Sequence, residues 1–183
     1  MVTLKEAVTK ADLKRFVTFP FSLYKDSPYW VPPIISDELE SFDKEKNPAF
    51  KNADAWFYLA YKEGRLVGRI VAIINWVEVK QQQVKKMRFG WFDFIDDPEV
   101  SETLMAKVTA LAEEHQLQFL EGPVGFSNLD KVGVLTEGFE HIGSMITWYN
   151  YAYYVKHYER LGFQKEKGYL ENNSTTWSNG VTS

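Results

Sequence analysis

The chain contains no cysteine, which excludes disulfides, thiolate metal sites and a cysteine nucleophile. It has only three histidines, His115, His141 and His157. They offer few candidates for a histidine metal site or a Ser-His-Asp triad, and we expect no metal. No apolar run reaches the roughly 20 residues that cross a membrane. The first ten residues, MVTLKEAVTK, lack the apolar core of a signal peptide, so we expect a cytoplasmic protein. A net charge of −4 gives no electrostatic footprint for nucleic acid or an anionic membrane.

Aromatic side chains are abundant, at 16% of the 183 residues, while the hydrophobic share of 45% is ordinary for a globular protein. A chain of this length can bury one substantial core. We expect a single domain over residues 1–171, followed by a polar, frayed tail over residues 172–183. The aromatic residues indicate a broad core, a lined groove, or both.

Hydrophobic patterns predict a sheet built around a hairpin. Segments 55–62 and 65–76 read as strands on either side of Glu63 and Gly64, a pair typical of tight turns. Segment 84–95 is apolar on both faces, which predicts a central strand covered on both sides.

In that third strand, strict alternation places Phe89, Trp91 and Asp93 on one face and Gly90, Phe92 and Phe94 on the other. Further short strands are expected at the N-terminus, over 117–122 and after Phe163.

Helix signals occur between these strands. A first helix is interrupted or bent near Pro20, and a second begins at Asp97-Pro98-Glu99, where Asp97 can cap the helix. A last helix starts with Asn150 as its N-cap and ends at Gly162. The order predicts an α+β domain with a central, mostly antiparallel mixed sheet flanked by helices.

The stretch HYERLGFQK, residues 157–165, resembles the end of the fourth helix in the GNAT superfamily of acyl-CoA-dependent N-acyltransferases. GRLVGRIVAI, GPVGFSN, GVLTEGF and YNYAYY also resemble a little-characterised GNAT-like family whose members are often longer, which implies a short or truncated member. The resemblance spans about residues 2–171 and implies a GNAT-like fold.

This resemblance implies that acetyl-CoA or another acyl-CoA lies where the fourth and fifth strands part. It also implies that Tyr158 protonates the departing thiolate, a reasonable role for a positioned phenol. The alternative is that Tyr158 only packs beneath the helix end.

The stretch FIDDPEV, residues 94–100, departs from the family pattern. GNAT enzymes usually hold the CoA diphosphate here with a glycine-rich loop, whose amides and helix N-terminus bind anions. This chain has no glycine in the stretch, Pro98 lacks an amide donor, and Asp96, Asp97 and Glu99 repel a diphosphate. Either CoA binds differently or it does not bind.

A relocated cofactor cradle is one interpretation of Gly122, Gly125, Ser127 and Asn128, with Lys131 as a cation. The other interpretation is a glycine-bearing loop with nothing bound, because such a loop without a helix start is weak evidence.

Glu137 is the first candidate for the base that deprotonates an amine acceptor, and His141 is the second. The alternative for both residues is a solvated loop, in which Glu137 can also pair with a basic residue such as Lys131. Four residues are candidates for binding a small-molecule substrate: Trp91, Phe126, Tyr149 and Asn150. Core packing, and helix capping for Asn150, are the alternatives.

Three functions remain open. The first is acyl transfer, such as acetyl transfer, to a small amine or an amino-acid-like acceptor. The second is a non-catalytic GNAT-like ligand-binding domain, possible as one half of a larger arrangement. The third is an assembly module, because no seventh strand is visible after residues 163–171 and an open sheet edge would favour a homodimer.

Overall fold

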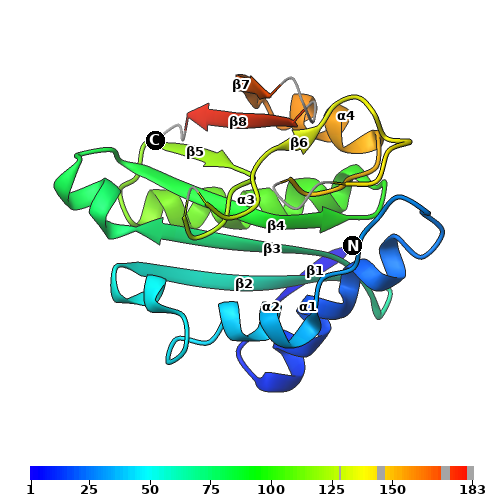
Figure 1. Cartoon of the computed structure of the whole chain (residues 1–183). Coiled ribbons are helices and arrows are strands. Elements are labelled where there is room, and N and C mark those ends of the chain that lie inside the picture. Colours follow the sequence, from blue (N-terminus) through cyan, green and yellow to red (C-terminus); the bar gives the residue numbers. More distant parts are fainter. Residues whose placement is uncertain (128, 144–146, 170–173, 181–183) are drawn as a thin grey trace.

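The computed structural model describes residues 1–127, 129–143, 147–169 and 174–180. Its centre is an eight-stranded mixed sheet with the order β1-β2-β3-β4-β5-β8-β6, and β7 pairs with β8 (Figure 1). The α+β prediction is therefore confirmed. The strands are β1 Val2–Glu6, β2 Ala53–Lys62, β3 Arg65–Asn75, β4 Lys86–Phe94, β5 Phe119–Gly122, β6 Val134–Leu135, β7 Gln164–Tyr169 and β8 Ser174–Gly180.

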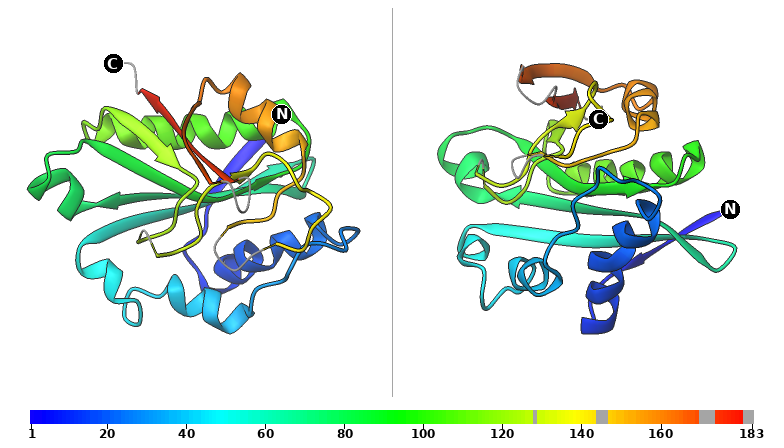
Figure 2. Two further views of the ribbon diagram at one scale, coloured as in Figure 1. Left: turned by 45° about the horizontal axis from the view of Figure 1, so that its top comes forward. Right: turned by 45° about the vertical axis from the view of Figure 1, so that its right-hand side comes forward.

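The helices are α1 Lys10–Leu23, α2 Ile35–Ser41, α3 Pro98–Glu114 and α4 Tyr153–Arg160, with short turns at Pro48–Lys51 and Val77–Gln81. The two faces of the sheet carry separate cores, with α3 on one and α1 and α2 on the other (Figure 2). In β3 the side chains of Ile70 and Ala72 join the α3 core, and those of Val71 and Ile73 join the α1 core. This alternation is what a strand buried on both sides requires.

The predicted hairpin is confirmed. β2 and β3 pair antiparallel, and both turn residues, Glu63 and Gly64, have positive φ values of 51° and 75°. Two positive φ angles match the twist of the flanking strands and favour a two-residue turn.

A β-bulge interrupts β4 and changes the expected alternation. Arg69 pairs with Asp93 and Val71 with Gly90, so Trp91 and Phe92 together lie opposite Ile70. Trp91 has a φ of 45°, which only a firmly held non-glycine residue adopts. The prediction that Phe89 shares a face with Trp91 is therefore wrong: Phe89 joins Phe92 and Phe94 in the α3 core, and Trp91 joins the α1 core.

β4 and β5 part shortly after they begin. They run parallel only from Lys86 opposite Phe119 to Arg88 opposite Glu121. One more backbone bond follows, from the amide of Val124 to the carbonyl of Phe89 at 2.9 Å. The second half of β4 is thus left to the segment 123–150 and to α4.

Three expectations about element ends are corrected. α1 continues through Pro20 to Leu23, so the predicted interruption at this proline is wrong. α4 begins at Tyr153, with Ala152 as its N-cap, so Asn150 is not the cap. Residues 174–180 of the expected tail form β8, which lies between β5 and β6.

β8 pairs with the free edge of β5, so the argument from a missing strand no longer supports a homodimer. The homodimer itself stays a prediction. Gly162 has a φ of 82° just after α4, as expected of a helix end.

Gly90→Ala tests the close approach of the 123–150 segment to the bulge. A Cβ at Gly90 would lie 2.5 Å from the carbonyl oxygen of Val124, a backbone atom that cannot move aside alone. We expect a loss of about 1–3 kcal/mol in the free energy of unfolding, measured by urea denaturation. Gly180→Ala, whose Cβ would meet nothing within 4 Å, is the control and should change it by less than about 0.5 kcal/mol. Equal effects of both substitutions would contradict the packing argument.

Candidate functional site

Asp93, just beyond the bulge, is the centre of a buried polar network. Its Oδ2 accepts hydrogen bonds from Nε of Arg69 at 2.9 Å and lies 2.8 Å from Nη2 of the same guanidinium. Its Oδ1 accepts hydrogen bonds from the hydroxyl groups of Tyr24 and Tyr154, each at 2.9 Å. These contacts compensate a carboxylate that burial would otherwise make costly.

Pro20 explains how Arg69 is held from the other side. A helical residue donates its N–H to the carbonyl four residues earlier, so a proline at position 20 leaves the carbonyl of Phe16 without its donor. Nη1 of Arg69 donates to this carbonyl at 2.8 Å. The guanidinium also lies 5.1 Å from the centroid of the Phe16 ring, in reach of a cation–π interaction. The proline thus creates the acceptor that orients the arginine.

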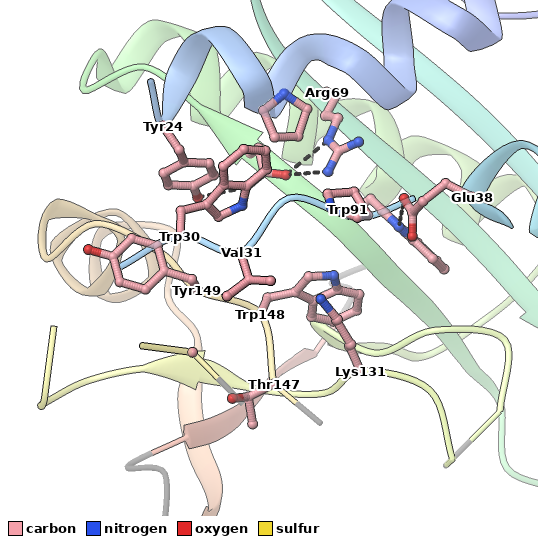
Figure 3. Close-up of a pocket in the computed structure, with 14 residues that line it drawn as sticks. Tyr24, Trp30, Val31, Glu38, Arg69, Trp91, Lys131, Thr147, Trp148 and Tyr149 are labelled. Atoms are coloured by element: carbon pink, nitrogen blue, oxygen red, sulfur yellow. Dashed lines mark hydrogen bonds and ion pairs between the residues drawn. The ribbon is translucent and has the colours of Figure 1, made fainter. Parts of the chain in front are cut away.

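Next to this ion pair is a cavity of about 40 Å³, here called the Lys131 cavity. Figure 3 shows Lys131 beside Trp148 on one side and Glu38 beside Trp91 on the other. Oε2 of Glu38 accepts a hydrogen bond from Nε1 of Trp91 at 3.0 Å. Five of the fourteen residues that line this cavity are aromatic, two are acidic and two are basic. The lining comprises Pro20, Tyr24, Trp30, Val31, Pro33, Glu38, Arg69, Trp91, Asp93, Lys131, Gly143, Thr147, Trp148 and Tyr149.

Lys131 is the one cation of this cavity outside the Arg69–Asp93 pair. Burial lowers the pKa of its ammonium group, and the carboxylates of Glu38 and Asp93 act in the opposite direction. Among the described residues, none makes a hydrogen bond or close ion pair with it. A charge in this position can meet a polar group of a ligand.

A second cavity of about 10 Å³, here called the Tyr158 cavity, continues from the first. The two share four lining residues: Trp91, Asp93, Trp148 and Tyr149. The second cavity lies at the point where β4 has left β5, between Phe92 of β4 and Pro123 of the following segment. Its remaining lining residues are Gly133, Val134, Asn150, Tyr154 and Tyr158. The cavities form two chambers along the bulged half of β4.

Tyr158 lies deep in the α3 core, with 1% of its surface exposed. Its ring packs against Phe89, Phe92 and Phe163 at centroid distances of 5.7–6.1 Å. Burial, and secondly the charge of Asp93, raise the pKa of its phenol well above the usual value. The phenol therefore stays protonated at neutral pH, which rules out a role as a resting base, and it is a weaker acid than a solvated phenol.

Among the predicted substrate-binding residues, Trp91 and Tyr149 line both cavities, and Asn150 lines the smaller one. Asn150 is buried and holds the loop: its Oδ1 accepts from the amide of Leu135 at 2.7 Å, and its Nδ2 donates to the carbonyl of Leu135 at 3.0 Å. Phe126 lines neither of these cavities and packs behind Trp91 at 5.8 Å between ring centroids.

The predicted cofactor-binding loop packs against the protein itself. A Cβ at Gly122 would lie 2.4 Å from the carbonyl of Phe89, and one at Gly125 would lie 2.4 Å from Cβ of Asp130. The amide of Ser127 donates to Oδ2 of Asp130 at 2.8 Å. Asn128 lies outside the described residues. Close packing thus accounts for both glycines, and their cofactor role stays a prediction.

The two predicted bases lie away from these cavities. Glu137 is exposed and lines neither chamber. The His141 side chain is 78% exposed and 4.0 Å from Glu140. Neither is placed beside Tyr158 or Asp93.

Asp93 and Arg69 were not predicted as site residues, and Lys131 was predicted only as the cation of a cofactor cradle or as a partner of Glu137. A signal was available, because each of the first two is a charged residue inside an otherwise apolar strand, in FDF and in GRIV. Charged side chains at such positions are buried and paired, and they mark polar networks or sites. Glu38 and Tyr24 carry no comparable local signal, since the fold alone brings α1 and α2 to the bulge.

The N-terminus of α3 carries the acidic stretch that departs from the GNAT pattern. Asp97 is the N-cap, and its Oδ1 accepts from the amide of Glu99 at 3.0 Å. Nζ of Lys62 lies 2.6 Å from Oδ2 of Asp97 and 2.8 Å from Oε2 of Glu99. The hydrogen bonds from Lys62 are the main cause that lowers the pKa of both carboxyl groups.

α4 is fastened to the same region. His157 is buried, with Nε2 2.8 Å from Oδ1 of Asp96 and Nδ1 2.6 Å from Oγ of Ser101. The hydroxyl of Tyr153 donates to the carbonyl of Phe94 at 2.5 Å. The end of β4, the start of α3 and α4 are therefore joined by side-chain hydrogen bonds.

Within the described ranges, no three histidine, aspartate or glutamate side chains gather closely enough to hold a metal ion. In the same ranges, no helix is long and apolar enough to span a membrane.

Two curated proteins are similar in sequence. Protein YghO of Escherichia coli K12 is 32% identical over 158 residues, which cover 86% of this chain and 40% of that protein. The bacterial ceramide synthase of Caulobacter vibrioides is 29% identical over 160 residues, covering 86% of this chain and 41% of that protein. The chain thus spans about two fifths of the length of these relatives. No protein-family model matches it.

Solved structures with the same fold include GNAT proteins. A tandem GNAT protein from the clavulanic acid biosynthesis pathway superposes with a TM-score of 0.61 at 14% identity, over 91% of this chain and 45% of the other. The PaiA N-acetyltransferase of Thermoplasma acidophilum, solved in complex with coenzyme A, gives a TM-score of 0.57 at 12% identity, over 98% and 99%. The fold is therefore GNAT-like, as the sequence resemblance implied.

Arg69→Met tests the Asp93 network. It leaves a buried carboxylate without its cation, and we expect a loss of about 3–5 kcal/mol in the free energy of unfolding. Arg65→Met, at the exposed start of β3, is the matched control and should cost less than about 0.5 kcal/mol. Urea denaturation measures both.

Pro20→Ala tests the orphaned carbonyl of Phe16. Alanine returns an N–H to the helix, which can bond the carbonyl of Phe16 once Arg69 is gone. The change in the free energy of unfolding caused by Pro20→Ala should therefore be more favourable by about 1 kcal/mol in the Arg69→Met background than in the wild type. Strictly additive effects in this double-mutant cycle would show that the proline and the arginine act independently.

Lys62→Gln tests the acidic start of α3. The pKa values of Asp97 and Glu99 are lower in the folded state than in the unfolded state. These two carboxylates therefore stabilise the folded state above the unfolded pKa of about 4, and this stabilisation is lost as the pH falls through the folded pKa values. Removing Lys62 raises both folded values, so stability should fall less between about pH 4 and pH 2 than in the wild type. Lys51→Gln, an exposed lysine, should leave the wild-type acid profile unchanged.

Proposed function

We propose that this chain is an N-acyltransferase module, which moves an acyl group from a thioester to an amine. The observation that carries the proposal is the Tyr158 cavity, which brings a protonated, buried phenol to the bulged residues Trp91 and Asp93 at the parting of β4 and β5. In a GNAT-like fold this is the place that the sequence resemblance implies for the thioester. The name of the Caulobacter relative supports acyl transfer, because a ceramide is an amide of a fatty acid.

In the proposed reaction, the nitrogen of the amine attacks the carbonyl carbon of the thioester. A C–N bond forms, the C–S bond breaks, and the departing thiolate takes the proton of Tyr158. Tyr158 is protonated at neutral pH and so carries the proton to be donated, while its raised pKa makes it a weaker acid than a solvated phenol. The donor side of the site is thus the Tyr158 cavity.

The Lys131 cavity would receive the acceptor. Trp91 and Tyr149 contact both substrates, because they line both chambers. Glu38 is the proposed base that takes the proton of the amine, in place of Glu137, since its carboxylate lies in the cavity wall, where it accepts a hydrogen bond from the Trp91 indole. Asp93 is a positioning residue, because its oxygens are occupied by Arg69, Tyr24 and Tyr154.

A non-catalytic ligand-binding module is the second candidate. The capped and ion-paired start of α3 favours it, because the usual place for the CoA diphosphate is occupied by carboxylates. Such a module would bind a ligand in the Lys131 cavity without turnover. The two candidates differ in one measurable quantity, the release of thiol.

The test is release of free thiol from acetyl-CoA and from a long-chain acyl-CoA, with a panel of amines as acceptors. Because the chain has no cysteine, the protein itself adds no thiol signal. We expect amine-dependent release, and Tyr158→Phe should lower kcat by about 10²–10⁴-fold.

Tyr61→Phe removes the same hydroxyl from β2, outside both chambers, and should leave kcat unchanged. Melting curves of both variants establish that they are folded. Release without any effect of Tyr158→Phe would remove Tyr158 from the mechanism, and the absence of release with every acceptor would favour the non-catalytic module.

A further inference from the structure

We infer that the acyl donor is held by its acylated pantetheine arm and that no diphosphate is seated at the N-terminus of α3. The inference rests on the proposed function and specifies its donor. It concerns the connection from β4 to α3, where the resemblance to GNAT enzymes would place the diphosphate of CoA.

The first residues of α3 have no free backbone N–H group to donate to an anion. Pro98 has no N–H, and the N–H of Glu99 donates to Oδ1 of Asp97. The N–H groups of Val100 and Ser101 donate to the carbonyl of Asp97 at 3.0 and 3.4 Å. An anion site at a helix start needs exactly these amides to be free. In this helix they are absent or already bonded.

The charge of the region also opposes a diphosphate. Asp96, Asp97 and Glu99 are acidic, and the nearby Lys62 is bonded to two of them. A diphosphate could recruit Lys62 only by breaking both ion pairs, and it would then lie beside the released carboxylates. Like charges at such distances repel, whereas the existing pairs are already formed.

α4 fills the space along the same edge. Tyr153 donates to the carbonyl of Phe94, and the amide of Phe94 lies 3.4 Å from the hydroxyl of Tyr154. One turn later, His157 bridges Asp96 and Ser101. The backbone of the last β4 residue and the first turn of α3 are thus bonded to α4 rather than open to a nucleotide.

The Tyr158 and Lys131 chambers lie on the bulged part of β4, before this closed end. A thioester presented to Tyr158 would approach along this bulged part of β4, with the remainder of its donor directed away from the start of α3. S-acyl pantetheine is the chemistry that the site would recognise. It is presented equally by free acyl-CoA and by the phosphopantetheine arm of a carrier protein.

Calorimetric titration of the wild-type chain tests the inference, with pantetheine, dephospho-CoA and CoA as probes. Protein concentrations should detect millimolar affinity. We expect the three dissociation constants to agree within threefold, because the portions that differ make no contact at α3. CoA binding ten or more times tighter than pantetheine would overturn the inference and leave the proposed acyl transfer intact. The absence of binding for all three would overturn the proposed function, and the inference with it.

A variant locates the result at α3. If a diphosphate were held there, Lys62→Gln would weaken CoA binding by tenfold or more and leave pantetheine binding alone. We expect no change beyond threefold for either probe. Lys51→Gln is the matched control for the loss of one positive charge.

A carrier protein bearing an acylated arm, supplied as the donor in the thiol-release assay, separates the two sources of the arm. Turnover with this carrier and with acyl-CoA at equal kcat/KM would identify the arm as the recognised part. Turnover with acyl-CoA alone would contradict this.

Discussion

The buried ion pair between Arg69 and Asp93 is the interaction on which the site depends. It joins β3 to β4, and its other hydrogen bonds extend to α1 through Phe16 and Tyr24 and to α4 through Tyr154. A buried pair of charges stabilises only when its polar atoms have partners, and here each nitrogen of the Arg69 guanidinium and both oxygens of Asp93 have one. The bulge at Trp91 is necessary for this arrangement, because without the extra residue Asp93 would face the α3 core. The strain of one positive φ angle is thus offset by a complete polar network.

Much of the fold was predictable from local sequence. The hairpin at Glu63 and Gly64, the capping of α3 by Asp97 and the end of α4 at Gly162 each follow from residues adjacent in the chain. The bulge was not predictable, because RFGWFDF alternates regularly and only the pairing with β3 reveals the extra residue. β8 was also missed, since its polar sequence becomes a strand by pairing with the edge of β5.

The candidate site divides in the same way. Tyr158, Trp91 and Tyr149 came from the sequence and line the chambers, although their roles stay proposals. Glu38 and Lys131 meet there only through the packing of α2 and the 123–150 segment around β4, which no local pattern records. The glycines at 122 and 125 illustrate the converse: a pattern typical of phosphate binding is explained by the close approach of two backbones. The acidic stretch before α3 was interpreted correctly as a capped helix start, because capping depends on three consecutive residues.

The tryptophans around the Lys131 cavity have an optical consequence. Trp30, Trp91 and Trp148 all border this one chamber, half of the six in the chain, and the Trp91 indole is hydrogen-bonded to a carboxylate. A molecule that enters displaces solvent from these rings and alters the polarity around them. The intrinsic fluorescence of the unlabelled protein therefore reports directly on occupancy of the chamber, so that ligands can be found by their effect on emission before any reaction is known.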